Sequence, residues 1–307
     1  MKETTVASAS SKIRERGVDR AFNIFIYVLS AFIIVAVMYP LLYVLSASFS
    51  SPGEIVRGNI IFLPRKFTLE SYKAILSNSR IITGYGNTVF ISVVGTTINL
   101  VMTTMLAYPL SMRRLAGRNI VTIFVTFTMF FSAGMIPNYL LMRDLHLLNT
   151  YWVLMLPGAI SVYNMLVMKN YFQSSIPAEL IDAAMIDGCS NLKTFFKIVL
   201  PLSKAIMAVM LIFYVAGHWN AYFDALMYVS DKAKHPLQLV LRDILLQAQT
   251  YAEENLGGQG FSLADQALRE VGIQYATIVV SSVPVMLLYP LMQKYFVKGV
   301  MIGAVKG

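Results

Sequence analysis

The feature that most constrains this chain is a series of six long runs that contain no charged side chain. A helix needs about 20 apolar residues to cross a hydrocarbon core of about 30 Å, and every run is close to this length or longer. The runs are Ala21–Gly53, Ile81–Met112, Asn119–Met142, Leu145–Met168, Ala205–Phe223 and Val271–Gln293. We therefore predict an all-α polytopic membrane protein with six transmembrane helices, within residues 21–293.

The composition of the chain supports a lipid-covered surface. Hydrophobic residues make up 57% of the chain and charged residues 13%, whereas soluble domains are about 45–50% apolar and about 25% charged. These values exclude a disordered chain, a secreted disulfide scaffold and an ordinary cytosolic enzyme. The single cysteine, Cys189, excludes an internal disulfide and a CxxC metal site.

The segments between the runs carry unequal positive charge. Because six spans place both termini on one side, residues 1–20, 113–118, 169–204 and 294–307 share a side, with 15 Lys and Arg. The opposite segments, 54–80, 143–144 and 224–270, hold 10. The positive-inside rule predicts a multi-pass plasma-membrane protein with a cytoplasmic N-terminal arm 1–20, loop 169–204 and tail 294–307. The net charge of +9 is then explained by basic residues that set the topology and lie next to anionic lipid on the cytoplasmic side. Nucleic-acid binding is not needed to explain it.

The sequence lacks the motifs of catalysis. It contains no GxxxxGK[ST] phosphate loop, no HExxH and no GxSxG. The six runs hold no Asp, Glu, Lys or Arg, which disfavours a pump that relies on buried carboxylates. We therefore predict no catalytic residue, cofactor or metal site in this chain, and an energy source on a partner.

The segment 169–204 is patterned as two short amphipathic helices. Ser174-Ser175-Ile176-Pro177 is a helix-start signal, and Gly188 falls where a left-handed residue would end the first helix. Ser190 or Asn191 is placed to cap the second helix, which Leu200-Pro201 ends. The apolar faces are Leu180, Ala183, Ala184 and Asp187 in the first helix and Leu192, Phe195, Phe196 and Val199 in the second. The pattern fits a hairpin on the membrane surface and a docking knob for a soluble partner equally well.

Residues in this segment carry a family resemblance. Asp182-Ala183-Ala184, three residues, Gly188, nine residues and then Ile198-x-Leu200-Pro201 resembles the EAA loop of binding-protein-dependent ABC importer permeases, with Asp182 where the family usually has Glu. Ile176–Leu180, Ile186–Gly188 and the ending Tyr295–Gly299 with Gly303–Gly307 are typical of the carbohydrate-uptake branch. The chain is similar to the smaller maltose-type permease, and from Pro137 onward to Gram-positive permeases for pectin-derived or other complex oligosaccharides.

The resemblance implies a type I importer permease that works in a complex. The implied partners are a second, non-identical permease, two ATPase subunits that bind ATP and Mg, and an extracytoplasmic sugar-binding lipoprotein. The loop would couple to the ATPase, and the tail would contact it through Lys298, Gly299, Gly303 and Lys306. The implied coupling residues are Glu179, Asp182, Ala183, Ala184, Asp187, Gly188, Phe195, Phe196, Ile198, Leu200 and Pro201.

Polar and aromatic residues in the runs mark a candidate sugar pathway. They are Tyr163, Asn164, His218, Trp219, Asn220 and Tyr222, and they fit interhelical hydrogen bonding or an interfacial aromatic belt as well as sugar contact. Gly95, Gly217 and Gly272 indicate close helix packing. The extracytoplasmic loop 224–270 would face the binding protein or form a passive cap. The alternative function is a self-sufficient secondary carrier or channel for small polar solutes, which usually shows an internal repeat that the runs lack.

Overall fold

The computed structural model describes residues 17–255, 271–287, 290 and 293, and its elements are helical throughout these ranges apart from one isolated bridge between Ser50 and Phe67. The predicted tail contacts Lys298, Gly299, Gly303 and Lys306 lie outside the described residues. The elements are α1 (Gly17–Ser48), α2 (Pro52–Val56), α3 (Glu70–Ser77), α4 (Ser79–Ser111), α5 (Arg118–Phe130), α6 (Met135–Asp144), η1 (Trp152–Leu154), α7 (Val162–Ser175), α8 (Ala178–Ile186), α9 (Asn191–Thr194), η2 (Phe195–Val199), α10 (Leu200–Leu202), α11 (Lys204–Asn220), α12 (Phe223–Tyr228), η3 (Lys232–Lys234), α13 (Leu237–Asn255) and a last apolar helix, Val271–Leu287.

The helices follow the apolar runs only in part. By length and composition α1 and α4 are each able to cross a membrane, and the number rises to four if two bent pairs each count as one span. The third run is broken: α5 and α6 meet at 113° around Gly134, whose φ of 89° lies in the left-handed region. The fourth run becomes helical only at Val162, because Leu156-Pro157-Gly158 interrupts it. The charge-free runs therefore overestimated the length of the continuous helix in the third and fourth spans.

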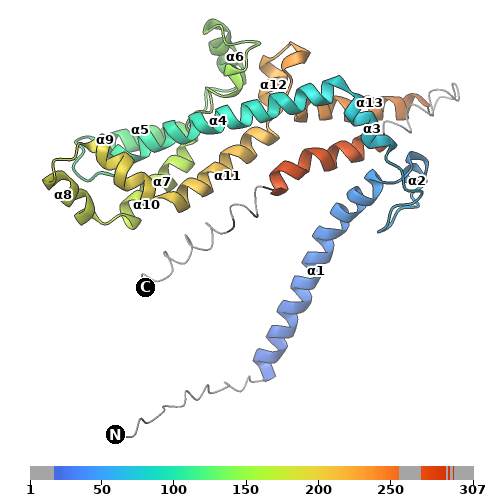
Figure 1. Cartoon of the computed structure of the whole chain (residues 1–307), viewed down its shortest axis with the longest axis horizontal. Helices are drawn as coiled ribbons and strands as arrows, with labels where there is room; N and C mark the ends of the chain where they lie inside the picture. The colour runs from blue at the N-terminus through green and yellow to red at the C-terminus, as the bar shows by residue number, and fades with distance from the viewer. Residues whose placement is uncertain (1–16, 256–270, 288–289, 291–292, 294–307) are drawn as a thin grey trace.

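Helix α4 is the centre of the described bundle. It packs against α11, α7 and α13, with α7 and α11 beside one half of its length and α13 beside the other (Figure 1). In contrast, α1 diverges from the bundle, and the whole of its most apolar stretch is exposed. Only its last residues, Ser46, Ala47 and Ser48, are buried.

Polar side chains join α4 to α11 inside this apolar bundle. Asn99 donates from Nδ2 to the Gly158 carbonyl at 2.6 Å, and its Oδ1 lies 2.6 Å from Nε2 of His218. A Cβ on Gly95 would lie 2.5 Å from the same His218 nitrogen, so only glycine leaves room for the ring. A Cβ on Gly272 would lie 2.5 Å from Ser71 Oγ. Close packing is therefore confirmed at both glycines. At Gly217 no atom of the described residues lies within 4 Å of an added Cβ, so these ranges show no close packing there.

The segment after α1 is held by a buried carboxylate. Glu54 pairs with Lys66 at 2.8 Å and accepts a hydrogen bond from Asn59 Nδ2 at 2.7 Å. The hydrogen bond from Lys66 is the first cause, and that from Asn59 the second, of a pKa for Glu54 below its usual range. The charged form of Glu54 therefore stabilises the folded loop.

Acid is expected to loosen this loop. The pKa of Glu54 is lower in the folded chain than in the unfolded chain. Its contribution to the stability of the loop is therefore fully present above the unfolded pKa of about 4.3. This contribution is lost as the pH falls through the folded pKa. Hydrogen exchange of amides 50–66, corrected for intrinsic rates, should rise on acidification, and Glu54→Gln should show fast exchange already at neutral pH. Glu70→Gln, which changes an exposed carboxylate, is the matched control; equal exchange in both variants would contradict the role of Glu54.

Candidate functional site

The segment predicted to couple to a partner forms two helices around a glycine. Gly188 has φ of 74°, its N–H donates to the Met185 carbonyl at 3.0 Å, and the Cys189 N–H donates to Ala184 at 2.9 Å. These two bonds form a Schellman motif, which closes α8 and redirects the chain. Ser190 then caps α9 by accepting from the Lys193 N–H, so the predicted elbow and second cap are confirmed. The predicted serine cap of α8 was wrong, because Pro177 holds the N-cap position without a side-chain bond.

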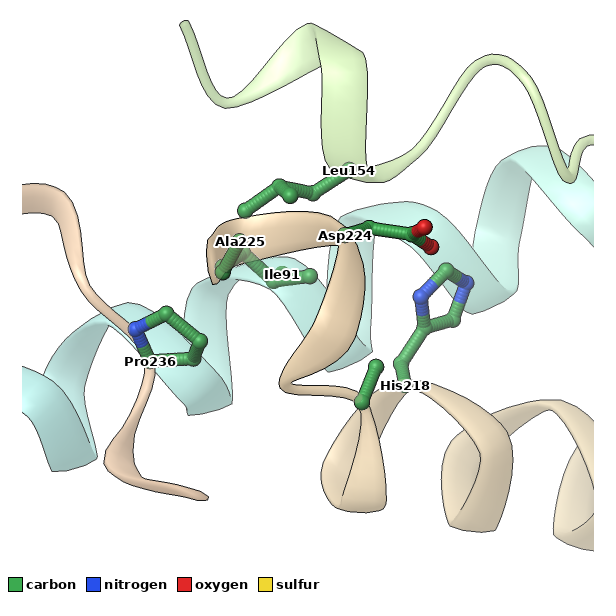
Figure 2. A pocket seen from close by; sticks show the side chains of 7 residues that line it. Ile91, Leu154, His218, Asp224, Ala225 and Pro236 are labelled. Carbon is green, nitrogen blue, oxygen red and sulfur yellow. The ribbon is translucent and has the colours of Figure 1, made fainter. Parts of the chain in front are cut away.

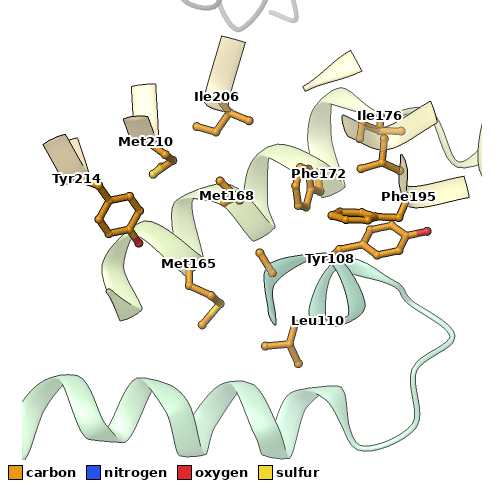
Figure 3. Close-up of a cluster of buried hydrophobic side chains, with 12 residues drawn as sticks. Tyr108, Leu110, Met165, Met168, Phe172, Ile176, Phe195, Ile206, Met210 and Tyr214 are labelled. Atoms are coloured by element: carbon orange, nitrogen blue, oxygen red, sulfur yellow. The ribbon is translucent and has the colours of Figure 1, made fainter. Parts of the chain in front are cut away.

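The two adjacent phenylalanines have opposite environments. Phe195 begins the π-helical turn η2 and is 5% exposed, with its ring 4.9 Å from that of Tyr108 on α4. Figure 3 shows Phe195 between Tyr108 and Phe172 inside the main apolar cluster. Phe196 is 62% exposed. Assigning both rings to one partner-facing surface was therefore wrong: Phe195 anchors the loop to this chain, and Phe196 is free to meet a partner.

The other predicted coupling residues divide in the same way. Glu179, Asp182, Ala183, Asp187, Gly188 and Pro201 are exposed, Ala184 is buried, and Ile198 and Leu200 are intermediate. The implied coupling residues did not include Ile186 or Leu192, although Leu192 was placed on the apolar face of the second helix. These two side chains are 86% and 69% exposed and lie on either side of the glycine elbow. We call Ile186, Leu192 and Phe196 the apolar knob. Large apolar side chains exposed in a charged loop are suited to a contact with a protein partner or with the membrane surface.

An ion pair fixes α8 to the turn that follows α4. Arg114 Nη2 lies 2.9 Å from Asp182 Oδ1, and its Nη1 lies 3.0 Å from the Met185 sulfur. Both charged groups are exposed, so the pair contributes about 0–1 kcal/mol. The pair orients the carboxylate of Asp182, the residue at the Glu position of the EAA motif, toward Arg114 of the same chain.

The candidate sugar-path residues also separate into two groups. Trp219 is buried and donates from Nε1 to the Ser281 carbonyl at 2.8 Å, so it joins α11 to the last helix. His218 is bound to Asn99 as described, and Asn164 is buried at the start of α7. Tyr163, Asn220 and Tyr222 are exposed. Interhelical bonding thus accounts for His218 and Trp219, while the exposed three are able to meet a solute.

A small pocket lies at the end of α11 (Figure 2). It is lined by Ile91, Leu154, His218, Ala221, Asp224, Ala225 and Pro236. Asn99 Oδ1 must accept, because Nδ2 donates to a carbonyl, and His218 Nε2 therefore carries the proton. When the ring is neutral, its Nδ1 is an acceptor.

The carboxylate of Asp224 points toward this ring (Figure 2). Asp224 is exposed as a residue, yet the pocket wall reduces its hydration and raises its pKa. Two acceptors facing one pocket fit a group with two donors, and no Ser or Cys nucleophile lines it. Among the described residues there is also no group of His, Cys, Asp and Glu that could hold a metal.

The described chain is a bundle of apolar helices with a helix–glycine–helix loop, and comparison with known proteins identifies its family. Residues 5–302 match the family "Binding-protein-dependent transport system inner membrane component". The chain belongs to this family. It is therefore a membrane permease of an ABC importer that works with ATPase and binding-protein partners, and the secondary carrier or channel is not supported.

Individual relatives agree over nearly the whole chain. It is 42% identical over 268 residues to Protein LplC of Bacillus subtilis, covering 87% of this chain and 89% of that protein. It is 40% identical over 291 residues to the Polygalacturonan/rhamnogalacturonan transport system permease protein YtcP of Bacillus subtilis, covering 94% and 99%. A chain in the crystal structure of a bacterial ABC transporter for import of the acidic polysaccharide alginate superposes with a TM-score of 0.83 at 32% identity, covering 92% and 99%. The type I importer permease fold is thus confirmed.

The opposite environments of Phe195 and Phe196 predict opposite defects. Phe195→Ala should lower the stability of the permease itself by about 3–5 kcal/mol, because it leaves a cavity in the core. Phe196→Ala should leave that stability unchanged and weaken association with the ATPase by about 2 kcal/mol, as loss of an exposed anchor does. Thermal unfolding of the isolated chain and ATPase binding measure the two effects; a destabilised Phe196→Ala with normal binding would contradict the assignment.

Proposed function

We propose that this permease imports oligosaccharides released from acidic polysaccharides such as pectin. The observation that carries the proposal is 40% identity, over 94% of this chain, to a permease named for polygalacturonan and rhamnogalacturonan. The similar alginate importer also handles an acidic polysaccharide. The two substrates named are acidic sugar polymers, so the proposed class is an oligouronide.

The proposed complex has one copy of this chain, a second, non-identical permease, two ATPase subunits that bind ATP and Mg, and an extracytoplasmic sugar-binding lipoprotein. The termini, the 113–118 turn and the α8–α9 loop face the cytoplasm, which the excess of Lys and Arg supports. The exposed apolar length of α1 fits a surface covered by lipid and by the second permease. This chain carries no catalytic residue, and Lys298, Gly299, Gly303 and Lys306 of its tail contact the ATPase.

In the proposed mechanism the apolar knob sits in a cleft of the ATPase. Closure of the ATPase moves α8 and α9 as a unit, because the Schellman motif fixes the turn between them. The movement reaches α4 through the ring of Phe195 and α11 through α10. Rigid-body rocking of these helices then alternates access to the sugar.

On the sugar path, we assign contact to the exposed Tyr163, Asn220 and Tyr222 and to the pocket at Asp224. Aromatic faces and amides suit sugar rings and hydroxyls. The acceptor pair of His218 Nδ1 and Asp224 suits two hydroxyl donors of one sugar.

Reconstitution tests the function directly. Vesicles containing both permeases and the ATPases should accumulate labelled trigalacturonate only when the binding protein is outside and ATP is inside. Omitting any one subunit should abolish uptake. Uptake by this chain alone would contradict the proposal and favour a self-sufficient secondary carrier. A cysteine introduced at position 190 that reacts with a reagent from outside would contradict the cytoplasmic orientation of the α8–α9 loop.

Substitution at the glycine elbow separates geometry from docking. Gly188→Val should abolish uptake while membrane insertion persists, because a left-handed conformation costs an ordinary residue about 1–2 kcal/mol and a β-branched one more. Among the described residues no atom lies within 4 Å of the added Cβ, so the expected effect is backbone strain. Gly188→Asn, which tolerates this conformation, is the control and should keep most uptake; equal loss in both variants would show that the surface, and not the turn, is what matters.

A further inference from the structure

The segment that follows α2 turns back along the C-terminal end of α1 (Figure 1). Ser46 Oγ donates to the Phe62 carbonyl at 2.6 Å, and the ring of Phe62 lies 5.5 Å from the ring of Tyr39. Both partners of Phe62 are residues of α1. We call residues 57–67 the return loop, because they run back beside the helix that precedes them.

The return loop is attached to α1 at two levels. Tyr39, beside Phe62, precedes the end of α1 by nine residues, or about 13 Å of helix. The Arg65 N–H donates to Ser50 Oγ at 2.9 Å, beyond the end of the helix. A span of about 20 residues counted from Ala21, where the first charge-free run begins, ends close to Tyr39. The ring of Phe62 therefore lies near the boundary of the hydrocarbon core, and Arg65 lies on the headgroup side of that boundary.

At the lower level the return loop exposes three consecutive large apolar side chains. Ile61, Phe62 and Leu63 are each more than half exposed, and Leu63 reaches 77%. Ile60, directly before them, is buried in the apolar cluster at the end of α1. The contact of Phe62 with Tyr39 joins these side chains to the apolar surface of α1, whose most apolar stretch is fully exposed. The loop therefore extends the surface of α1 that lipid covers.

At the upper level the return loop is basic. Arg57, Arg65 and Lys66 are exposed. Glu54 Oε1 lies 2.8 Å from Lys66 Nζ and 3.9 Å from Arg57 Nη1, and within the described residues it is the single carboxylate paired with these cations. One carboxylate among three cations leaves an excess of two positive charges. The loop thus has an apolar edge at the level of the hydrocarbon boundary and a cationic edge above it.

This order of side chains matches the depth profile of a bilayer. Interfacial segments bury apolar side chains about 5–10 Å into the headgroup–acyl boundary, and cations above them are attracted to anionic headgroups. A protein partner would not need the apolar and basic side chains to follow the depth of α1. We propose that the return loop inserts into the outer leaflet, with Ile61, Phe62 and Leu63 at the acyl boundary and Arg57 and Arg65 at the phosphates of anionic phospholipid; the leaflet rests on the orientation given under the proposed function.

Insertion would hold two helices at one depth in the bilayer. Ile60 shares its cluster with Ala47 of α1, and Val271 and Tyr275 of the last helix pack against this cluster. The return loop therefore contacts the end of α1 and the start of the last helix together. The inference also gives a role to the basic residues that segment 54–80 carries on the side of the membrane with fewer Lys and Arg.

The test measures contact between the return loop and lipid in the assembled importer. The fluorophore NBD is attached to Leu63→Cys, with Cys189→Ser in this chain and partner subunits that lack cysteine, in vesicles of phosphatidylcholine and phosphatidylglycerol. Lipid with a doxyl quencher near the top of its acyl chain should quench the label at position 63. Leu76→Cys, on α3 and 73% exposed, is the matched control and should be much less quenched.

The same label measures selectivity for the headgroup. At equal mole fraction, doxyl-phosphatidylglycerol should quench position 63 more than doxyl-phosphatidylcholine, with a preference of about fivefold for each of the two cations. Arg57→Gln and Arg65→Gln should each lower this preference about fivefold. Lys73→Gln, which removes an exposed cation of α3, should leave it unchanged.

Other outcomes overturn the proposal. A label at position 63 that lipid quenches no more than at position 76 would show that the loop is outside the bilayer, and equal quenching by both headgroups would remove the anionic lipid. Quenching that disappears when the second permease assembles, or when the binding protein is added, would assign the surface to that partner. A quenched label that dithionite reduces only from the cytoplasmic side would contradict the orientation. A wild-type importer that accumulates sugar while position 63 is unquenched would leave the proposed function standing and remove only the insertion of the loop.

Discussion

The packing of α11 against α4 is the contact on which the rest of the described structure depends. Lipid offers no hydrogen bonds, so polar side chains inside the bundle must pair with one another. Asn99 and His218 do so, and Thr103 and Tyr214 repeat the arrangement one turn further along at 2.6 Å. Because α4 also contacts α7 and α13, the position of α11 on α4 determines the relative position of the loops at both ends.

The loop formed by α8 and α9 is attached to this same contact. Phe195 packs on Tyr108 of α4, and α10 passes into α11 through a bend of 81°. The cluster around them includes Met165, Met168 and Met210, whose flexible side chains adapt to small shifts without opening a cavity. A displacement of the α8–α9 loop would therefore reach α4 and α11 through packed side chains.

Local patterns in the sequence predicted the local features well. Gly188 and Ser190 were identified because a left-handed glycine and a serine cap depend on a few neighbouring residues. The long helices α1 and α4 followed from apolar length alone. The broken third and fourth runs did not, because turns at Gly134 and Pro157 contain no charge and so do not interrupt a charge-free run.

Features that depend on contacts between distant parts of the chain could not be predicted from the sequence pattern. The π-helical turn at Phe195 changes the register, so that Phe195 and Val199 face inward and Phe196 outward, although a regular spacing grouped the two rings. The Arg114–Asp182 pair joins residues 68 positions apart. His218 had the residue type of a sugar ligand, but a neighbour on α4 satisfies its Nε2.

The distribution of charge has a consequence for an acidic substrate. The six charge-free runs of this chain contain no Lys or Arg, and the pocket at the end of α11 presents two acceptors, His218 Nδ1 and Asp224. Acceptors bind hydroxyls and repel carboxylates. Under the proposed function the charge-free runs of this chain therefore contact the hydroxyl face of an oligouronide and supply no cation for its carboxylates. Selection between acidic and neutral sugars would then arise from the assembled pair of permeases, with this subunit recognising the features that both kinds of sugar share.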